Sequence, residues 1–110
     1  MSQQSVYRDN KGHVGLELMK GEVAEAVLEA IKEINQDVKV TDLPGFIIVE
    51  VPGRMRLEAE LVREHLGKND WTMQDLNEVT PVYTGNVEVY TEDTMVLSWN
   101  KKLPENIGEA

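Results

Sequence analysis

Residues 21–35, GEVAEAVLEAIKEIN, carry the clearest periodic pattern in the chain. Val23, Val27 and Ile31 recur at steps of four residues, which places their side chains on one face of a helix. Strand-like stretches lie on either side of this helix, VGLELM at 14–19 and the β-branched FIIVEV at 46–51. Mixed helix and strand patterns joined by short turns predict an α+β fold.

The second half of the chain follows a similar order. Residues 55–60 open as a strand and lead into a helix that Gly67 ends. A short helical turn and a strand near 77–83 are expected next, followed by a turn at 84–86 and a hairpin from 87–91 and 94–99. With a further strand over 38–43, the pattern predicts a single α+β domain of two β-α-β-β-like units. Its two small sheets are expected to be mostly antiparallel and to pack with two main helices.

The two ends of the chain lack a repeating apolar pattern. We expect residues 1–12 to be a flexible N-terminal arm, 13–100 to be the folded domain and 101–110 to be a polar tail. Within the domain, Ile48 is predicted to be a core residue whose truncation to alanine costs about 2–5 kcal/mol. Trp71 and Trp99 are expected to anchor the core.

Composition limits the possible functions. The 110 residues include 11 Lys and Arg, 20 Asp and Glu and no cysteine, which gives a net charge of −9. Binding to a nucleic-acid backbone needs cationic side chains, so nucleic acid is not expected as a partner. Disulfides and thiolate metal sites are excluded. No apolar run approaches the roughly 20 residues of a membrane helix, and the first residues lack the blocks of a secretory signal. The expected location is therefore cytoplasmic, with no membrane partner.

The chain shows no recognisable catalytic motif. It has neither a G-x-S-x-G nucleophile elbow nor a phosphate-binding P-loop. Neither His13 nor His65 has a glutamate three residues before it, so the Glu-x-x-His pairs of a di-iron site are missing. We predict a surface position for His65, and no catalytic, cofactor-binding or metal-ligating residue. Two readings of the residues stay open: a small acidic protein-interaction module, and an enzyme that uses a pair of carboxylates.

Three stretches together resemble a known family: HVGLELMKGEVAEAVLEAI at 13–31, LPGFIIVEVPGRMRLEAELVREHLGKNDWTMQDL at 43–76 and TGNVEVYTEDTMVLSW at 84–99. They are similar to the effector proteins, also called regulatory or coupling proteins, of bacterial multicomponent di-iron monooxygenases. That family serves methane, phenol, toluene, alkene and propane monooxygenases. The shared features include a Val-Gly before the first strand and a Gly-acidic pair that opens the first helix. This chain departs from some relatives in having Leu16 where a proline often follows the glycine.

The resemblance implies a protein with no cofactor and no activity of its own. It would bind the di-iron hydroxylase and modulate O₂ activation, substrate access and coupling during hydrocarbon or aromatic oxidation, in competition with a reductase or ferredoxin. Gly85→Trp is then expected to weaken stimulation of the hydroxylase and leave the fold intact. The residues expected to contact the partner are Tyr7, Asn10, His13, Val14, Gly15, Thr84, Gly85 and Asn86.

Overall fold

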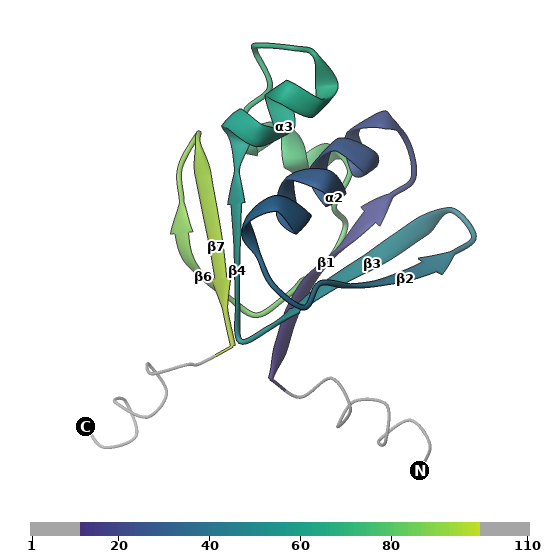
Figure 1. Cartoon of the computed structure of the whole chain (residues 1–110), viewed down its shortest axis with the longest axis vertical. Coiled ribbons are helices and arrows are strands. Elements are labelled where there is room, and N and C mark those ends of the chain that lie inside the picture. The colour runs from purple at the N-terminus through teal and green to yellow at the C-terminus, as the bar shows by residue number, and fades with distance from the viewer. Residues whose placement is uncertain (1–11, 100–110) are drawn as a thin grey trace.

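Two antiparallel sheets converge at one corner of the molecule, and two helices lie in the space between them (Figure 1). The structure is a computed structural model that describes residues 12–99. The elements, in chain order, are β1 (His13–Met19), α2 (Glu22–Ile34), β2 (Lys39–Leu43), β3 (Phe46–Pro52), β4 (Arg54–Glu58), α3 (Ala59–Leu66), a 3₁₀ helix (Met73–Glu78), β5 (Tyr83–Thr84), β6 (Asn86–Tyr90) and β7 (Thr94–Ser98). None of the helices within 12–99 is long and apolar enough to cross a bilayer.

Each sheet is built largely from one half of the chain. The first has the strand order β2-β3-β1-β5 and the second has the order β4-β7-β6. The chain passes between the sheets three times, and residues 59–82, with α3 and the 3₁₀ helix, make the second crossing, from β4 to β5. The other two crossings each use a single glycine with positive φ: Gly53 (φ 76°) between β3 and β4, and Gly85 (φ 123°) between β5 and β6. Because glycine has no Cβ, it reaches these angles with little strain. The two glycines therefore make the sharp corner at which the sheets meet.

This arrangement confirms the predicted α+β fold with two small antiparallel sheets and two main helices. The prediction of a strand near 77–83 is wrong over most of its length, because a 3₁₀ helix covers Met73–Glu78 and β5 has only two residues. The Asp75 carboxylate accepts a hydrogen bond from the Thr72 amide at 2.9 Å, a side-chain contact that favours a helical start. Pro81 has no amide hydrogen to donate to a neighbouring strand.

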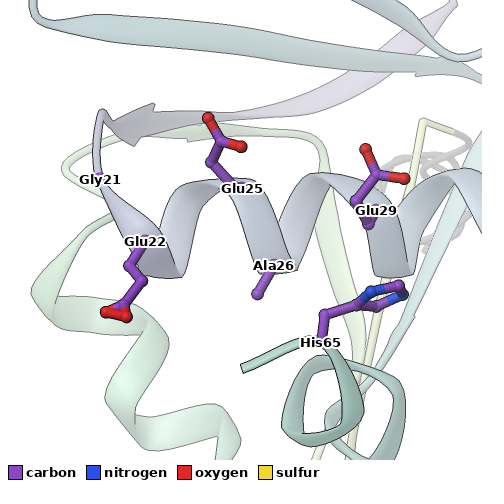
Figure 2. A pocket seen from close by; sticks show the side chains of 6 residues that line it. All are labelled: Gly21, Glu22, Glu25, Ala26, Glu29 and His65. Atoms are coloured by element: carbon purple, nitrogen blue, oxygen red, sulfur yellow. The ribbon is translucent and has the colours of Figure 1, made fainter. Parts of the chain in front are cut away.

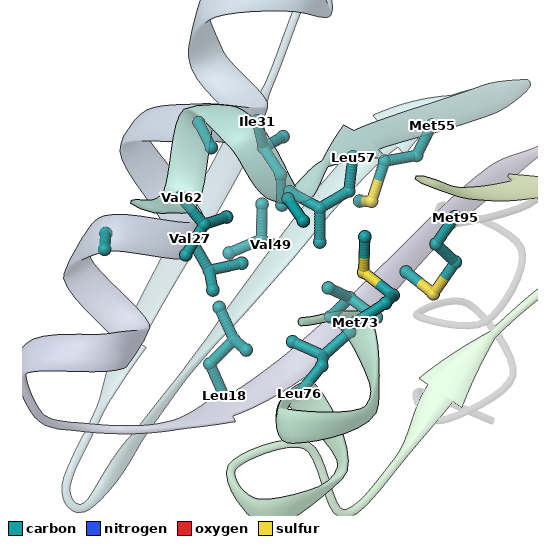
Figure 3. Close-up of a cluster of buried hydrophobic side chains, with 14 of the residues drawn as sticks. Leu18, Val27, Ile31, Val49, Met55, Leu57, Val62, Met73, Leu76 and Met95 are labelled. Carbon is teal, nitrogen blue, oxygen red and sulfur yellow. The ribbon is translucent and has the colours of Figure 1, made fainter. Parts of the chain in front are cut away.

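The hydrophobic core lies between the inner faces of the sheets and the two helices (Figure 3). On β1 and β3 the inward residues include Leu16, Leu18 and Val49, all buried. Ile48 points to the opposite face of β3 and is only half-buried, so its predicted place in the core is wrong. Residues 46–49 are all apolar, so this part of the sequence has no alternation that would distinguish the buried face of β3 from its outer face.

The two tryptophans differ in their surroundings. Trp71 is 6% exposed and belongs to the core cluster, as predicted, and its carbonyl oxygen accepts a hydrogen bond from Arg63 Nε at 2.7 Å. Trp99 follows the last residue of β7 and is 40% exposed, so the prediction that it anchors the core is wrong.

Asn35 joins the end of α2 to the second sheet. Its Nδ2 donates to the carbonyl oxygens of Ile31 and Arg56, both at 2.8 Å, and its Oδ1 accepts from the Arg56 amide at 2.9 Å. β4 is an edge strand whose outer amides and carbonyls would otherwise face solvent. The asparagine side chain therefore pairs with β4 much as a neighbouring strand would.

We expect Asn35→Ala to lower the free energy of unfolding by about 2 kcal/mol, because it removes two hydrogen bonds that hold the end of α2 against β4 and a third to the last turn of α2. Urea denaturation of the full chain measures this change. The matched control is Asn69→Ala, at an exposed position where the structure gives the side chain no hydrogen bond within 12–99. An equal effect at the two positions would contradict this role for Asn35.

Candidate functional site

The two groups of predicted contact residues meet at the corner between the sheets. β1 pairs with β5 so that Gly15 lies opposite Thr84, and the following Gly85 leads into Asn86 at the start of β6. We call His13, Val14, Gly15, Thr84, Gly85 and Asn86 the β1–β5 corner. Tyr7 and Asn10 lie outside the residues that the structure describes.

The members of the β1–β5 corner differ in exposure. The Thr84 side chain is exposed, and His13, Gly85 and Asn86 are partly buried. Asn86 Nδ2 donates to the Ser98 carbonyl oxygen at 3.2 Å, which ties the corner to β7. Val14 and Gly15 are buried. Thr84 is therefore the member whose side chain is best placed to touch another molecule.

Close packing, rather than exposure, explains the glycines of this corner. A Cβ added to Gly85 would lie 2.8 Å from Val14 Cγ1, and one added to Gly15 would lie 2.4 Å from the Val49 carbonyl oxygen. Contacts this short force the neighbouring atoms to move. Gly85 also has a φ of 123°, which disfavours any side chain. The expectation that Gly85→Trp leaves the fold intact is therefore wrong.

Exposed apolar side chains continue from the corner along β5 and β6. Five of the nine large hydrophobic residues that are exposed within 12–99 lie between positions 82 and 90. These residues are Val82, Tyr83, Val87, Val89 and Tyr90, and we call them the β5–β6 apolar segment. An exposed cluster of this kind is typical of a surface that another molecule covers. The sequence predicts only a hairpin strand over 87–91 and does not indicate this segment, because an irregularity between Val87 and Val89 breaks the alternation there.

A second surface feature is an acidic hollow between α2 and α3 (Figure 2). Its volume is about 520 Å³, and Glu22, Glu25 and Glu29 from α2 line it opposite His65 from α3. His65 lies on the surface, as predicted, and its Nε2 contacts the Glu33 carboxylate within hydrogen-bonding distance. Within 12–99, no group of three or more His, Asp and Glu side chains is placed to hold a metal ion.

Comparisons with known proteins cover nearly the whole described chain. Residues 12–98 match the family model of the MmoB/DmpM family. A chain in a structure of a phenol hydroxylase–regulatory protein complex is similar, with 26% identity, a TM-score of 0.72 and coverage of 80% of this chain and 99% of that one. No curated protein sequence matches the chain significantly.

Two further solved structures share the fold. A second phenol hydroxylase–regulatory protein complex contains a chain with 24% identity and a TM-score of 0.67, with coverage of 79% of this chain and 99% of that one. The soluble methane monooxygenase regulatory protein B has 16% identity and a TM-score of 0.65, with coverage of 87% of this chain and 72% of that one. Since the match to the family model covers residues 12–98, which include both sheets and both helices, this chain belongs to the MmoB/DmpM family.

Proposed function

We propose that this chain is the regulatory component of a multicomponent monooxygenase, and that it acts by binding the di-iron hydroxylase rather than by catalysis. The family match over residues 12–98 carries this proposal. The similar chain in the phenol hydroxylase–regulatory protein complex supports the same kind of partner. In this proposal the protein needs no cofactor and works in the cytoplasm.

The docking surface in this proposal is the β1–β5 corner together with the β5–β6 apolar segment. The two are continuous in the chain, since Thr84 and Gly85 lie between Tyr83 and Val87. Half-exposed tyrosines beside a small polar loop are typical of residues that dominate binding energy at an interface. Tyr7 and Asn10, which precede β1 in the sequence, complete the proposed set of contacts. We propose that residues 13–100 form the binding domain, between an arm over 1–12 and a tail over 101–110.

Regulation follows from differential binding. A protein that binds one conformation of the hydroxylase more tightly shifts the hydroxylase towards it, by a coupling free energy of about 1–3 kcal/mol. We propose that this shift changes O₂ activation, substrate access and the coupling of electron use to product. A reductase or ferredoxin that shares the surface would compete with this chain.

Direct binding of the full chain to a purified di-iron hydroxylase, measured by calorimetry at low and moderate ionic strength, tests the proposal. We expect saturable binding that persists at moderate salt, because the proposed surface is largely apolar and salt screens only the charged contacts. Binding that moderate salt abolishes would instead favour a generic acidic interaction module, for which the glutamates along α2 are the natural surface. Turnover of a substrate by the isolated chain, with a bell-shaped pH profile, would favour the carboxylate enzyme.

A further inference from the structure

A groove opens between the two sheets, and three residues of the β5–β6 apolar segment, Tyr83, Val87 and Tyr90, line it. Leu16 of β1, Leu76 of the 3₁₀ helix and Met95 of β7 form its floor, and each is at most 4% exposed. Tyr83 and Tyr90 stand at its sides and are about half exposed. Its volume is about 440 Å³, within the range of small-molecule sites in proteins. We call this feature the inter-sheet groove.

The floor of the groove is part of the folded core. Leu76 and Met95 lie near Met73 at one end of the buried cluster (Figure 3). A ligand in the groove would therefore rest on side chains that the fold already holds in place, so little ordering would be needed on binding.

The lining of the groove carries no charge. None of its nine residues is acidic or basic, although 28% of the chain is charged. Three other hollows of the surface differ in this respect. Carboxylates line each of them. Glu22 and Glu25 line the hollow between the helices, and Asp42 of β2 lines the second. Glu17 and Glu50 line the third, on the outer face of the first sheet. Because an unpaired charge is costly to bury in apolar surroundings, the groove favours a neutral ligand.

Polar groups in the groove are few and only partly satisfied. Thr80 lines it, and Thr80 Oγ1 is buried without a hydrogen-bond partner within 12–99. The Tyr90 hydroxyl donates to the Met73 carbonyl at 3.3 Å and accepts from Asn77 Nδ2 at 3.4 Å, which are long contacts for hydrogen bonds. Because Thr80 Oγ1 has almost no accessible surface, it can pair with a ligand hydroxyl only after the side chain rotates about χ1 towards the groove. An aromatic ring suits the tyrosines and the Met95 sulfur.

We propose that the inter-sheet groove binds a small neutral aromatic molecule that carries one hydroxyl group. This inference concerns the isolated chain and does not depend on the proposed function. Adjacent apolar side chains of the docking surface, Val82 and Val89, are not part of the groove lining. Binding in the groove and binding at the hydroxylase are therefore separable by mutation.

The test is a titration of the isotopically labelled full chain with phenol, followed by amide shifts in NMR spectra at neutral pH, where phenol is uncharged. We expect saturable shifts centred on Leu16, Thr80 and Tyr83. Benzoate has the same ring and a negative charge, and it should bind at least about tenfold more weakly than phenol. Shifts that rise linearly without saturation, that centre on another surface, or that benzoate reproduces at equal concentration would overturn the site.

Two substitutions test the placement of the ligand. Val87→Phe adds a ring to the mouth of the groove and should weaken phenol binding by about tenfold. Its matched control, Val89→Phe, adds the same ring on the same strand outside the lining and should leave binding unchanged. Equal losses in the two variants would place phenol elsewhere.

Thr80→Val tests the hydrogen bond without filling the groove. It should weaken phenol binding by about fivefold and leave toluene binding unchanged, since toluene lacks the hydroxyl. An equal loss for the two probes would overturn the role of Thr80. The amide signals of the groove residues could instead shift only when the hydroxylase is added, and never with phenol. That result would show that a side chain of the hydroxylase occupies the groove, and it would refute the small-molecule site.

Discussion

Replacing Gly15 by alanine is expected to lower the free energy of unfolding by about 3 kcal/mol. Gly15 lies in β1 between two neighbouring strands, opposite Glu50 of β3 and Thr84 of β5. A methyl group there would stand 2.4 Å from the Val49 carbonyl oxygen, closer than real Cβ contacts allow. Since the obstructing atom belongs to the backbone, β1 and β3 would have to separate. Urea denaturation of the full chain measures the loss.

Glu17→Ala is the matched control for this experiment. Glu17 lies two residues further along β1, on the same face of the sheet, and is only partly buried. Its replacement should change the free energy of unfolding by less than about 1 kcal/mol. If Gly15→Ala were as mild as Glu17→Ala, close approach of the strands would not explain the glycine, and a role in partner contact would become the better account.

The second large effect is expected at Thr84. Thr84→Arg should weaken binding to the hydroxylase by about tenfold or more, because it places a long charged side chain at the exposed member of the β1–β5 corner. The fold should persist, since the native Thr84 side chain faces solvent. Calorimetric titration of the hydroxylase with the variant measures the affinity, and the melting temperature checks the fold.

Asn69→Arg controls for the added charge. Asn69 is exposed in the loop that follows α3. This helix lies at the end of the molecule opposite to the point where the two sheets converge (Figure 1). This variant should bind the hydroxylase like the native chain. Equal weakening by Asn69→Arg would mean that net charge governs binding, and native affinity in Thr84→Arg would remove the corner from the interface.

Much of the fold could be predicted because its signals are local. The periodicity of α2, the glycine at the end of α3 and the two short strands of the final hairpin each lie within about fifteen residues. The assignment of 77–83 to a strand failed because Val79 and Val82 suggest a strand, whereas the Thr72–Asp75 contact and Pro81 favour a turn. Ile48 was placed in the core because β3 is apolar on both faces, and sequence alone does not say which face a helix covers.

The candidate site was less accessible to sequence analysis. The predicted contact residues came from two segments about 70 positions apart, and only the pairing of β1 with β5 brings Gly15 beside Thr84. Such long-range register depends on the whole sheet and leaves no local pattern. The roles of Gly15 and Gly85 in packing were missed for the same reason, because the atoms that crowd them belong to Val49 and Val14.

The most direct test of the central claim is the steady-state turnover of a purified di-iron hydroxylase and its reductase, measured as the full native chain is added. We predict that product formed per electron consumed rises with the concentration of the chain and reaches a plateau, while the chain alone converts no substrate. A hydroxylase whose rate and yield are the same with and without a saturating amount of this protein would contradict the account.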